Sequence, residues 1–186
     1  PAHAGGPLRY GVSVAQHDYT SALKMGFDWM ATYDIPTTRL PINIMYRVPV
    51  NRWSIDPNDP YGRWRYTNWL YDQLLPVADR IDAYEIGNEV NLYINGWEGA
   101  PDAQKYVEML CLTSQVIKSF DPTATIISAG LSPVGRIDGS WNGHKGHNYT
   151  SQDEREFLRE MIDAGGMNCT DAVGYHPNGF SANFDA

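Results

Sequence analysis

The chain has 186 residues, of which 42% are hydrophobic and 19% are charged, and its formal net charge is −8 because 22 acidic residues exceed 14 basic ones. This composition excludes intrinsic disorder, which requires few hydrophobic residues and a high net charge, and the length suits one domain or part of a larger one. A negative chain without a basic cluster is unsuited to nucleic-acid binding, and no apolar run is long enough to span a membrane as a helix.

The first third of the chain predicts short strands with one helix between them. Strands are predicted for three apolar stretches, Leu8–Ala15, Phe27–Tyr33 and Thr38–Val48. The residues Tyr19–Met25 favour a short helix that Gly26 ends. Only a very short link joins the second strand to the third, whereas parallel neighbours need a crossover of about a dozen residues. The alternative is a single strand with an irregular lead-in.

The rest of the chain predicts helices that alternate with strands. We interpret Asn51–Arg65, rich in Pro, Asp, Asn and Trp, as a loop. Pro76 should kink or shorten the helix that follows this loop, and Ser151 with Glu154 forms a capping-box pattern at the start of the last helix. The predicted helices are Thr67–Arg80, Asp102–Phe120 and a third from Ser151 to Gly165. The predicted strands are Ile81–Ile86, Thr125–Ala129 and Asp171–His176.

Short apolar strands that alternate with amphipathic helices indicate a parallel α/β fold. The count is about six strands, and the last ends shortly before the end of the sequence. The sequence contains no internal repeat and no low-complexity linker. We therefore expect one domain over residues 1–186, which continues beyond residue 186.

The segment AYEIGNEVN, residues 83–91, places polar side chains where a predicted strand ends. In parallel α/β folds, ligands bind at the carboxyl edge of the sheet. A glutamate at this edge, beside an asparagine, can act as a general acid, so Glu89 and Asn88 are candidate catalytic residues. The alternative is that Glu89 only caps the turn after the strand.

A second glutamate lies deeper in the same predicted strand. Period-two alternation puts Glu85 on the same face as Glu89. A lone buried carboxylate is costly, so Glu85 needs a cationic partner, for which Arg39 and Arg47 are the candidates. We interpret Glu85 as a structural residue.

Histidine and aromatic residues supply further candidates. His176 ends the last predicted strand, where it can bind substrate or adjust a carboxylate, although a hydrogen-bonded structural histidine is an equal alternative. His144 and His147 are spaced like metal ligands, but no acidic or cysteine partner is near them in sequence, so we expect no metal site and no cofactor. Side chains that can stack on a sugar are Tyr93, Trp97 and Trp141.

Two cysteines and two sequons bear on the compartment in which the protein works. Cys111 and Cys169 lack metal or redox spacing, and either a disulfide or two free buried cysteines fits the sequence. A disulfide is expected if the protein is secreted. Asn148 and Asn168 begin Asn-X-Thr sequons, which matter only if the chain meets a glycosylation system.

Four segments resemble the clan A glycoside hydrolases, which are (β/α)8-barrel enzymes. AYEIGNEVN resembles their fourth-strand motif, in which an Asn-Glu pair ends the strand, and DAVGYHPNGF resembles their sixth-strand segment. GFDWM resembles the entry to their second strand, and SAGLSP their fifth strand. The resemblance runs from the first strand to the sixth, and it is closest to the secreted, cellulase-like glycosidases of bacteria related to families 5 and 39.

The resemblance implies a role for each matching residue. Glu89 would be the acid/base of a retaining hydrolase that acts on a β-linked glycan, and Asn88 would hold the sugar 2-hydroxyl. His176 would line the site from the sixth strand, and Arg39 would match an active-site arginine of the early strands. The family also implies an extracellular protein with a carbohydrate partner and no metal.

The resemblance further implies a nucleophilic glutamate at the tip of a seventh strand, which would lie after Ala186. Glu85, Glu98 and Asp34 do not complete a carboxylate pair with Glu89 in this interpretation. We expect that the sequence is the N-terminal portion of a longer polypeptide, that a partner chain completes the barrel, or that the barrel is degenerate. In the last case the protein would bind glycan or have a structural role without catalysis. A zinc hydrolase that uses His144 and His147 is a weaker alternative.

Overall fold

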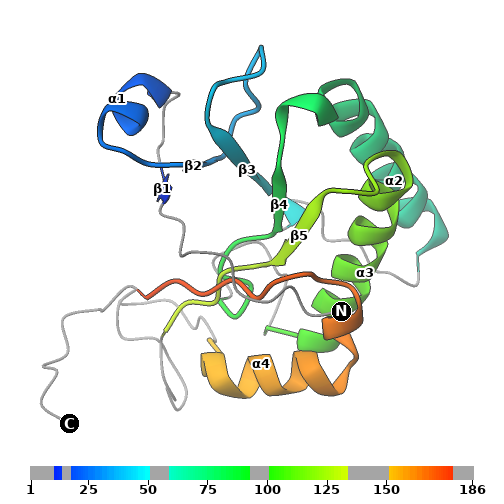
Figure 1. The fold of residues 1–186 in the computed structure, drawn as a ribbon. Helices are drawn as coiled ribbons and strands as arrows, with labels where there is room; N and C mark the ends of the chain where they lie inside the picture. Colours follow the sequence, from blue (N-terminus) through cyan, green and yellow to red (C-terminus); the bar gives the residue numbers. More distant parts are fainter. Residues whose placement is uncertain (1–10, 14–17, 51–58, 93–100, 134–150, 178–186) are drawn as a thin grey trace, which may run out of the picture.

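The described residues form a parallel sheet of five strands, whose order in space is their order in sequence. The computed structural model describes residues 11–13, 18–50, 59–92, 101–133 and 151–177. The strands are β1 (Gly11–Ser13), β2 (Trp29–Thr32), β3 (Asn43–Val48), β4 (Ala83–Ile86) and β5 (Thr125–Ser128), which lie side by side in Figure 1. The predicted parallel α/β sheet is therefore confirmed, whereas the closed eight-stranded barrel stays a prediction.

Each α-helix among the described residues begins directly after an aspartate. The helices are α1 (Tyr19–Lys24), α2 (Pro60–Leu74), α3 (Ala103–Phe120) and α4 (Glu154–Asp163). The N-cap residues, whose carboxylates accept hydrogen bonds from first-turn N–H groups, are Asp18, Asp59, Asp102 and Asp153. An N-cap carboxylate pairs N–H groups that have no partner within the helix and interacts favourably with the helix dipole. These aspartates therefore define where each helix starts.

The start of α2 corrects the predicted loop over Asn51–Arg65, because residues 60–65 are helical. Pro60 occupies the first turn, where its missing N–H is not needed and its fixed φ suits a helix. The α-helix ends at Leu74 and continues as a 3-10 helix, η2 (Leu75–Arg80), that contains Pro76. The expected shortening of the helix near Pro76 is confirmed.

The start of α4 corrects the predicted capping box. Asp153, and not Ser151, is the N-cap residue. The Arg155 guanidinium, 2.7 Å from the Asp153 carboxylate, is the largest cause that lowers the pKa of Asp153 to about 2. Ser151 instead pairs with Leu92 in an isolated antiparallel bridge. The loop after β4 is thereby joined to the segment that leads into α4.

β2 and β3 are two separate strands, although no helix connects them. They pair in parallel, with Met30 opposite Ile44. The link between them, residues 33–42, contains no helical residue. The alternative of a single strand with an irregular lead-in is therefore wrong.

The last predicted strand, Asp171–His176, is an irregular segment beside β5. It makes isolated parallel bridges, Ala172 to Ile127 and Tyr175 to Leu131. A Cβ on Gly174 would lie 2.4 Å from the Ser128 carbonyl oxygen, so the two backbones approach more closely than a side chain permits. The segment therefore takes the place of a sixth strand without a continuous ladder.

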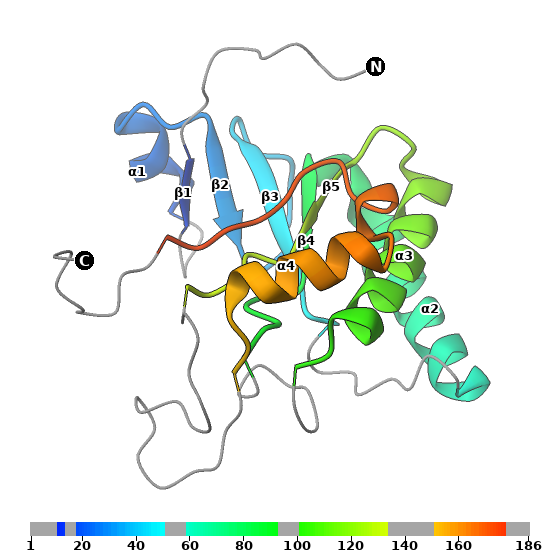
Figure 2. The same cartoon turned by 90° about the horizontal axis from the view of Figure 1, so that it is seen from below.

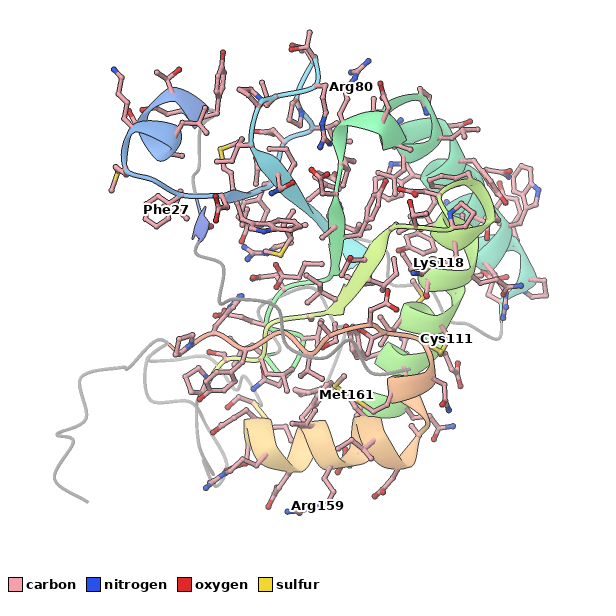
Figure 3. All side chains as sticks on the ribbon, viewed as in Figure 1. Phe27, Arg80, Cys111, Lys118, Arg159 and Met161 are labelled. Carbon is pink, nitrogen blue, oxygen red and sulfur yellow. A yellow bond between two sulfur atoms is a disulfide. The ribbon has the colours of Figure 1, made fainter. Side chains whose placement is uncertain are left out.

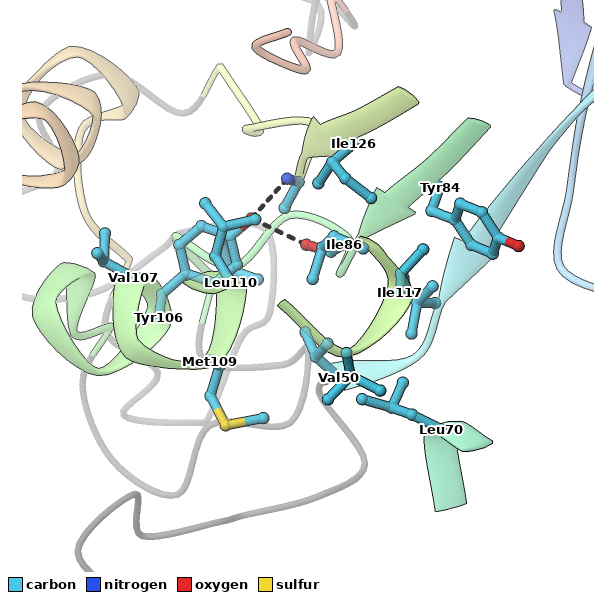
Figure 4. Close-up of a cluster of buried hydrophobic side chains, with 14 of the residues drawn as sticks. Val50, Leu70, Tyr84, Ile86, Tyr106, Val107, Met109, Leu110, Ile117 and Ile126 are labelled. Atoms are coloured by element: carbon cyan, nitrogen blue, oxygen red, sulfur yellow. Dashed lines mark hydrogen bonds between the residues drawn. The ribbon is translucent and has the colours of Figure 1, made fainter. Parts of the chain in front are cut away.

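The two faces of the sheet have different environments. One face packs against α2 and α3 in a buried cluster that includes Tyr84, Ile86 and Ile126 (Figure 4). Figure 2 shows α4 beside α3, with which it is in contact. The opposite face lines an open cavity of about 470 Å³, which is bounded mainly by apolar residues such as Trp29 and Met45. Helices on one side of a parallel sheet are what β-α-β crossovers of a single hand produce.

A buried tyrosine of α3 joins β4 to β5 where their pairing ends. The Tyr106 hydroxyl donates to the Ile86 carbonyl at 2.9 Å and accepts from the Ala129 N–H at 2.7 Å (Figure 4). Ile86 and Ser128 are the last paired residues of these strands. One hydroxyl therefore satisfies two backbone groups that would otherwise be buried without partners.

A disulfide links α3 to the segment that follows α4. Cys111 lies on α3 (Figure 3) and is bonded to Cys169, which directly follows the 3-10 helix η4 (Gly166–Asn168). Lys118 of α3 also pairs with Asp171, and the Asp171 carboxylate accepts the Ile126 N–H at 2.8 Å. These contacts hold the start of the irregular segment between α3 and β5.

We predict that Tyr106→Phe lowers the free energy of unfolding by about 1–3 kcal/mol, because it leaves the Ile86 carbonyl and the Ala129 N–H buried and unpaired. Urea unfolding checks this value. Tyr71→Phe is the matched control, since the Tyr71 hydroxyl bonds Ser119 at an exposed position. Equal effects of the two substitutions would contradict the assignment.

We predict that reduction of the Cys111–Cys169 disulfide destabilises the fold. The bridge spans a sequence separation of 58 residues, and the loss of a loop constraint of that size corresponds to about 4 kcal/mol in the chain-entropy account. Urea unfolding with and without a reductant measures the difference. Labelling of both cysteines in the unfolded, unreduced protein would show that the bridge is absent.

Candidate active site

The carboxyl edge of the sheet carries a cavity of about 350 Å³. The residues that line it come from the ends of β1, β2, β3 and β4 and from the segment after α4: Ser13, Tyr33, Arg47, Asn88, Glu89, His176 and Pro177. Parallel α/β folds place ligands at this edge. The structure thus brings three predicted residues, Asn88, Glu89 and His176, into one cavity.

The backbone at Glu89 is in the left-handed conformation, with a φ of 46°. Its N–H donates to the Gly130 carbonyl at 2.9 Å, and its carbonyl accepts from the Leu92 N–H at 2.9 Å. This conformation costs a residue with a side chain about 1–3 kcal/mol and is typical of functional sites. The loop therefore holds the Glu89 carboxylate at the cavity at some expense in stability.

A buried ion pair lies under the cavity. Arg47 and Glu85 occupy paired positions of β3 and β4, and the Arg47 Nε lies 2.6 Å from Glu85 Oε2. The other carboxylate oxygen, Oε1, accepts the Gly130 N–H at 2.9 Å. Arg47 also donates to the Tyr33 hydroxyl and lies over the Tyr33 ring. Of the two candidates for the partner of Glu85, the structure selects Arg47.

The charge state of Glu85 follows from competing influences. Burial opposes its ionisation, but hydrogen bonds from His176, Arg47 and the Gly130 N–H outweigh burial, so the pKa of Glu85 is lowered. Glu85 is therefore a buried carboxylate that stays ionised. The Arg47 guanidinium, the Gly130 N–H and the His176 ring, which contact its carboxylate, are all hydrogen-bond donors.

The His176 imidazole lies between the two glutamates. Its Nε2 is 3.4 Å from Glu85 Oε1, and its Nδ1 is 3.2 Å from Glu89 Oε1. The hydrogen bond with Glu85 and then that with Glu89 raise the pKa of His176 to about 9, against burial and the charge of Arg47. His176 is therefore an imidazolium at neutral pH.

Arg39 lies at the opposite edge of the sheet. Its Nη2 is 2.6 Å from Asp82 Oδ1, and Asp82 directly precedes β4. The same Asp82 carboxylate accepts the Ile44 N–H at the start of β3. Arg39 therefore does not line this cavity, and among the described arginines Arg47 is the one that does.

Several predicted residues lie outside the described residues: Tyr93, Trp97, Glu98, Trp141, His144, His147 and Asn148. Asn168 is described, and it is exposed at the end of η4. Within the described ranges, no group of three His, Cys, Asp or Glu side chains is placed to hold a metal ion. Nor does any helix in those ranges have the length and apolar composition needed to cross a bilayer.

Tyr33 and Asn91 also shape the site, although neither is a candidate from the sequence. Asn91 is buried, and its side chain donates to the Ser132 and Gln152 carbonyls and accepts the Ser132 N–H at 2.9 Å. It thus joins the loops after β4 and β5. The available signal was the position of Asn91 within AYEIGNEVN, just after the Asn-Glu pair.

Comparison with known proteins gives a structural match without a sequence match. No family model matches the chain, and no curated protein matches it. A solved structure with a similar fold is the GH53 catalytic domain of Ignisphaera aggregans, with 16% sequence identity and a TM-score of 0.52. The match covers 84% of this chain and 51% of that chain, so this chain spans about half of that structure. At this identity the likeness shows only that the fold resembles a glycoside hydrolase catalytic domain.

We predict that His176 makes folding stability depend on pH. Because its pKa is raised from 6.5 to about 9, its contribution is fully present below pH 6.5 and is lost as the pH rises through 9. The loss should be on the order of 1–3 kcal/mol. Urea unfolding of wild type and His176→Gln across this range measures it, and a constant difference between the two proteins would contradict the prediction.

Proposed function

We propose that the whole protein is a retaining glycoside hydrolase that acts on a β-linked glycan, with Glu89 as general acid and then general base. The observation that carries this proposal is the position of Glu89. It lies at the carboxyl edge of a parallel sheet whose fold resembles a glycoside hydrolase catalytic domain, in one cavity with Asn88 and His176.

In this mechanism Glu89 first protonates the glycosidic oxygen and later takes a proton from the attacking water. Asn88 holds the sugar 2-hydroxyl, a contact that strengthens in the transition state. A second carboxylate, about 5–5.5 Å from the first, must act as the nucleophile. Glu85 is buried and bonded to Arg47, which leaves it unsuited to attack. We therefore assign the nucleophile to a residue outside the described part of the chain.

The barrel of this enzyme would contain the described strands as its first part. Further polypeptide or a partner chain would supply the remaining strands. Two observations support this view: the chain aligns with about half of a glycoside hydrolase catalytic domain, and the face of the sheet opposite the helices lines an open, largely apolar cavity. The Cys111–Cys169 disulfide and the exposed Asn168 sequon support an extracellular location.

The alternative is a protein that binds glycan without cleaving it. The observation that favours it is the engagement of Glu85, because the site then presents Glu89 without a second carboxylate suited to attack among the described residues. This alternative would be supported if the full polypeptide binds an oligosaccharide and the oligosaccharide is then recovered uncleaved.

We predict that Glu89→Gln lowers turnover of unactivated β-glycosides on the order of 10²–10⁴-fold, because an amide cannot donate the proton. A dinitrophenyl β-glycoside has a leaving group that needs no proton, so formation of the glycosyl-enzyme should be nearly unaffected. Hydrolysis of the glycosyl-enzyme then stalls because no base activates water. Added azide, which needs no base, should restore turnover and give a glycosyl azide as the product. Steady-state assays with both substrates, with and without azide, measure these effects in the full-length protein.

Glu160→Gln is the matched control, since Glu160 is an exposed glutamate of α4. This variant should keep wild-type turnover with both substrates. If Glu89→Gln has unchanged turnover, Glu89 is not the acid/base. The same conclusion follows if the variant loses activity equally on both substrates and azide does not restore it.

A further inference from the structure

The His176 imidazole contacts a different carboxylate at each of its nitrogens. Charged and titratable groups face the ring from three places: Glu85 on β4, Glu89 after β4, and Arg47 on β3, which itself bonds the Tyr33 hydroxyl after β2. A neutral imidazole carries one N–H, and the hydrogen bond at one nitrogen decides which nitrogen keeps it. The surroundings of the two carboxylates therefore matter.

The two carboxylates differ in their access to water. The Glu85 side chain is 3% exposed, whereas the Glu89 side chain is 20% exposed. A buried anion that loses a donor pays the full cost of desolvation, whereas a partly exposed anion can accept a hydrogen bond from water instead. When the imidazolium loses one proton, the N–H that faces Glu85 is the costlier one to remove.

The contacts around Glu85 leave little freedom to rearrange. Its Oε2 is bonded to Arg47 and its Oε1 to the Gly130 N–H, so the carboxylate cannot turn away from the ring without losing these donors. The ring itself lies against Gly130, where a Cβ would be 2.2 Å from His176 Nε2. The backbone N–H of His176 also donates to the Leu131 carbonyl at 3.1 Å, which fixes the chain that carries the ring.

We propose that Glu85 is a positioning residue that fixes the tautomer of His176, so that Nε2 keeps its hydrogen and Nδ1, which faces Glu89, gains and loses the proton. Arg47 Nη2 lies 3.5 Å from Nε2 and would favour the opposite tautomer. The buried Glu85 carboxylate, 3.4 Å from the same nitrogen, outweighs it.

The use of this arrangement rests on the proposed function. Before the first step, His176 Nδ1 passes its proton to the Glu89 carboxylate, and Glu89 then gives that proton to the glycosidic oxygen. Glu89, again a carboxylate, takes a proton from the attacking water and returns it to Nδ1. The leaving sugar gains one proton and water loses one, so the residues end each cycle as they began.

The test is nuclear magnetic resonance of the full-length protein labelled with ¹⁵N at histidine. Long-range ¹H–¹⁵N correlations show which ring nitrogens carry hydrogen at each pH, and the His176→Gln spectrum identifies the His176 signals. We expect an imidazolium at neutral pH and, above its titration, a neutral ring protonated at Nε2. A neutral ring protonated at Nδ1 would overturn the proposal.

Glu85→Gln tests the role of the carboxylate. The titration of His176 should then move down towards the ordinary value of 6.5, and the preference for the Nε2–H tautomer should weaken. Glu160→Gln on α4 should change neither signal. An unchanged titration and tautomer in folded Glu85→Gln would overturn the proposal. If that variant does not fold, the tautomer of the wild-type protein decides.

The outcome is separable from that of the proposed function because the magnetic resonance signal requires no turnover. An Nε2–H tautomer in a protein that cleaves no glycoside would support the inference and contradict the glycosidase proposal. Cleavage by a protein with the Nδ1–H tautomer would support the glycosidase proposal and contradict the inference about the tautomer. Where cleavage is found, Glu85→Gln should move the basic limb of kcat/KM to lower pH, and an unmoved limb would overturn the coupling to Glu89.

Discussion

The ion pair between Arg47 and Glu85 is the interaction on which the site depends. Two charges inside a sheet are costly unless each is paired and hydrogen-bonded. β3 and β4 meet this demand because their register places the two side chains opposite each other. A shift of either strand by one residue would turn its charged side chain to the helix-covered face of the sheet and separate the pair. The charges therefore specify the alignment of the strands that carry the cavity.

The Gly130 backbone transmits this arrangement to the rest of the site. Its N–H bonds Glu85 and its carbonyl bonds the Glu89 N–H, so one residue after β5 contacts both glutamates. The absence of a side chain at this position lets the His176 ring approach. The irregular segment 171–177 brings that ring in from the other side of β5. Four parts of the chain that are distant in sequence thus meet through short contacts.

The sequence predicts the layout of this molecule better than its contacts. Alternating strands and helices predicted the parallel sheet, and the rule that ligands lie at the carboxyl edge brought Asn88, Glu89 and His176 together. The choice of Arg47 over Arg39 depends on the register between β3 and β4, which local residues do not encode. The early start of α2 had a local signal, Asp59-Pro60, but the polar and aromatic composition around it favoured a loop.

The Tyr106 hydroxyl marks the point where β4 and β5 stop pairing, and this has a consequence for how such a site changes over evolution. Since a side chain of α3 closes the ladder, the regular pairing of β4 with β5 is complete at Ile86 and Ser128. Insertions and substitutions in the two loops can alter what is bound while the strands stay aligned. Changes of this kind are thereby confined to one edge of the sheet.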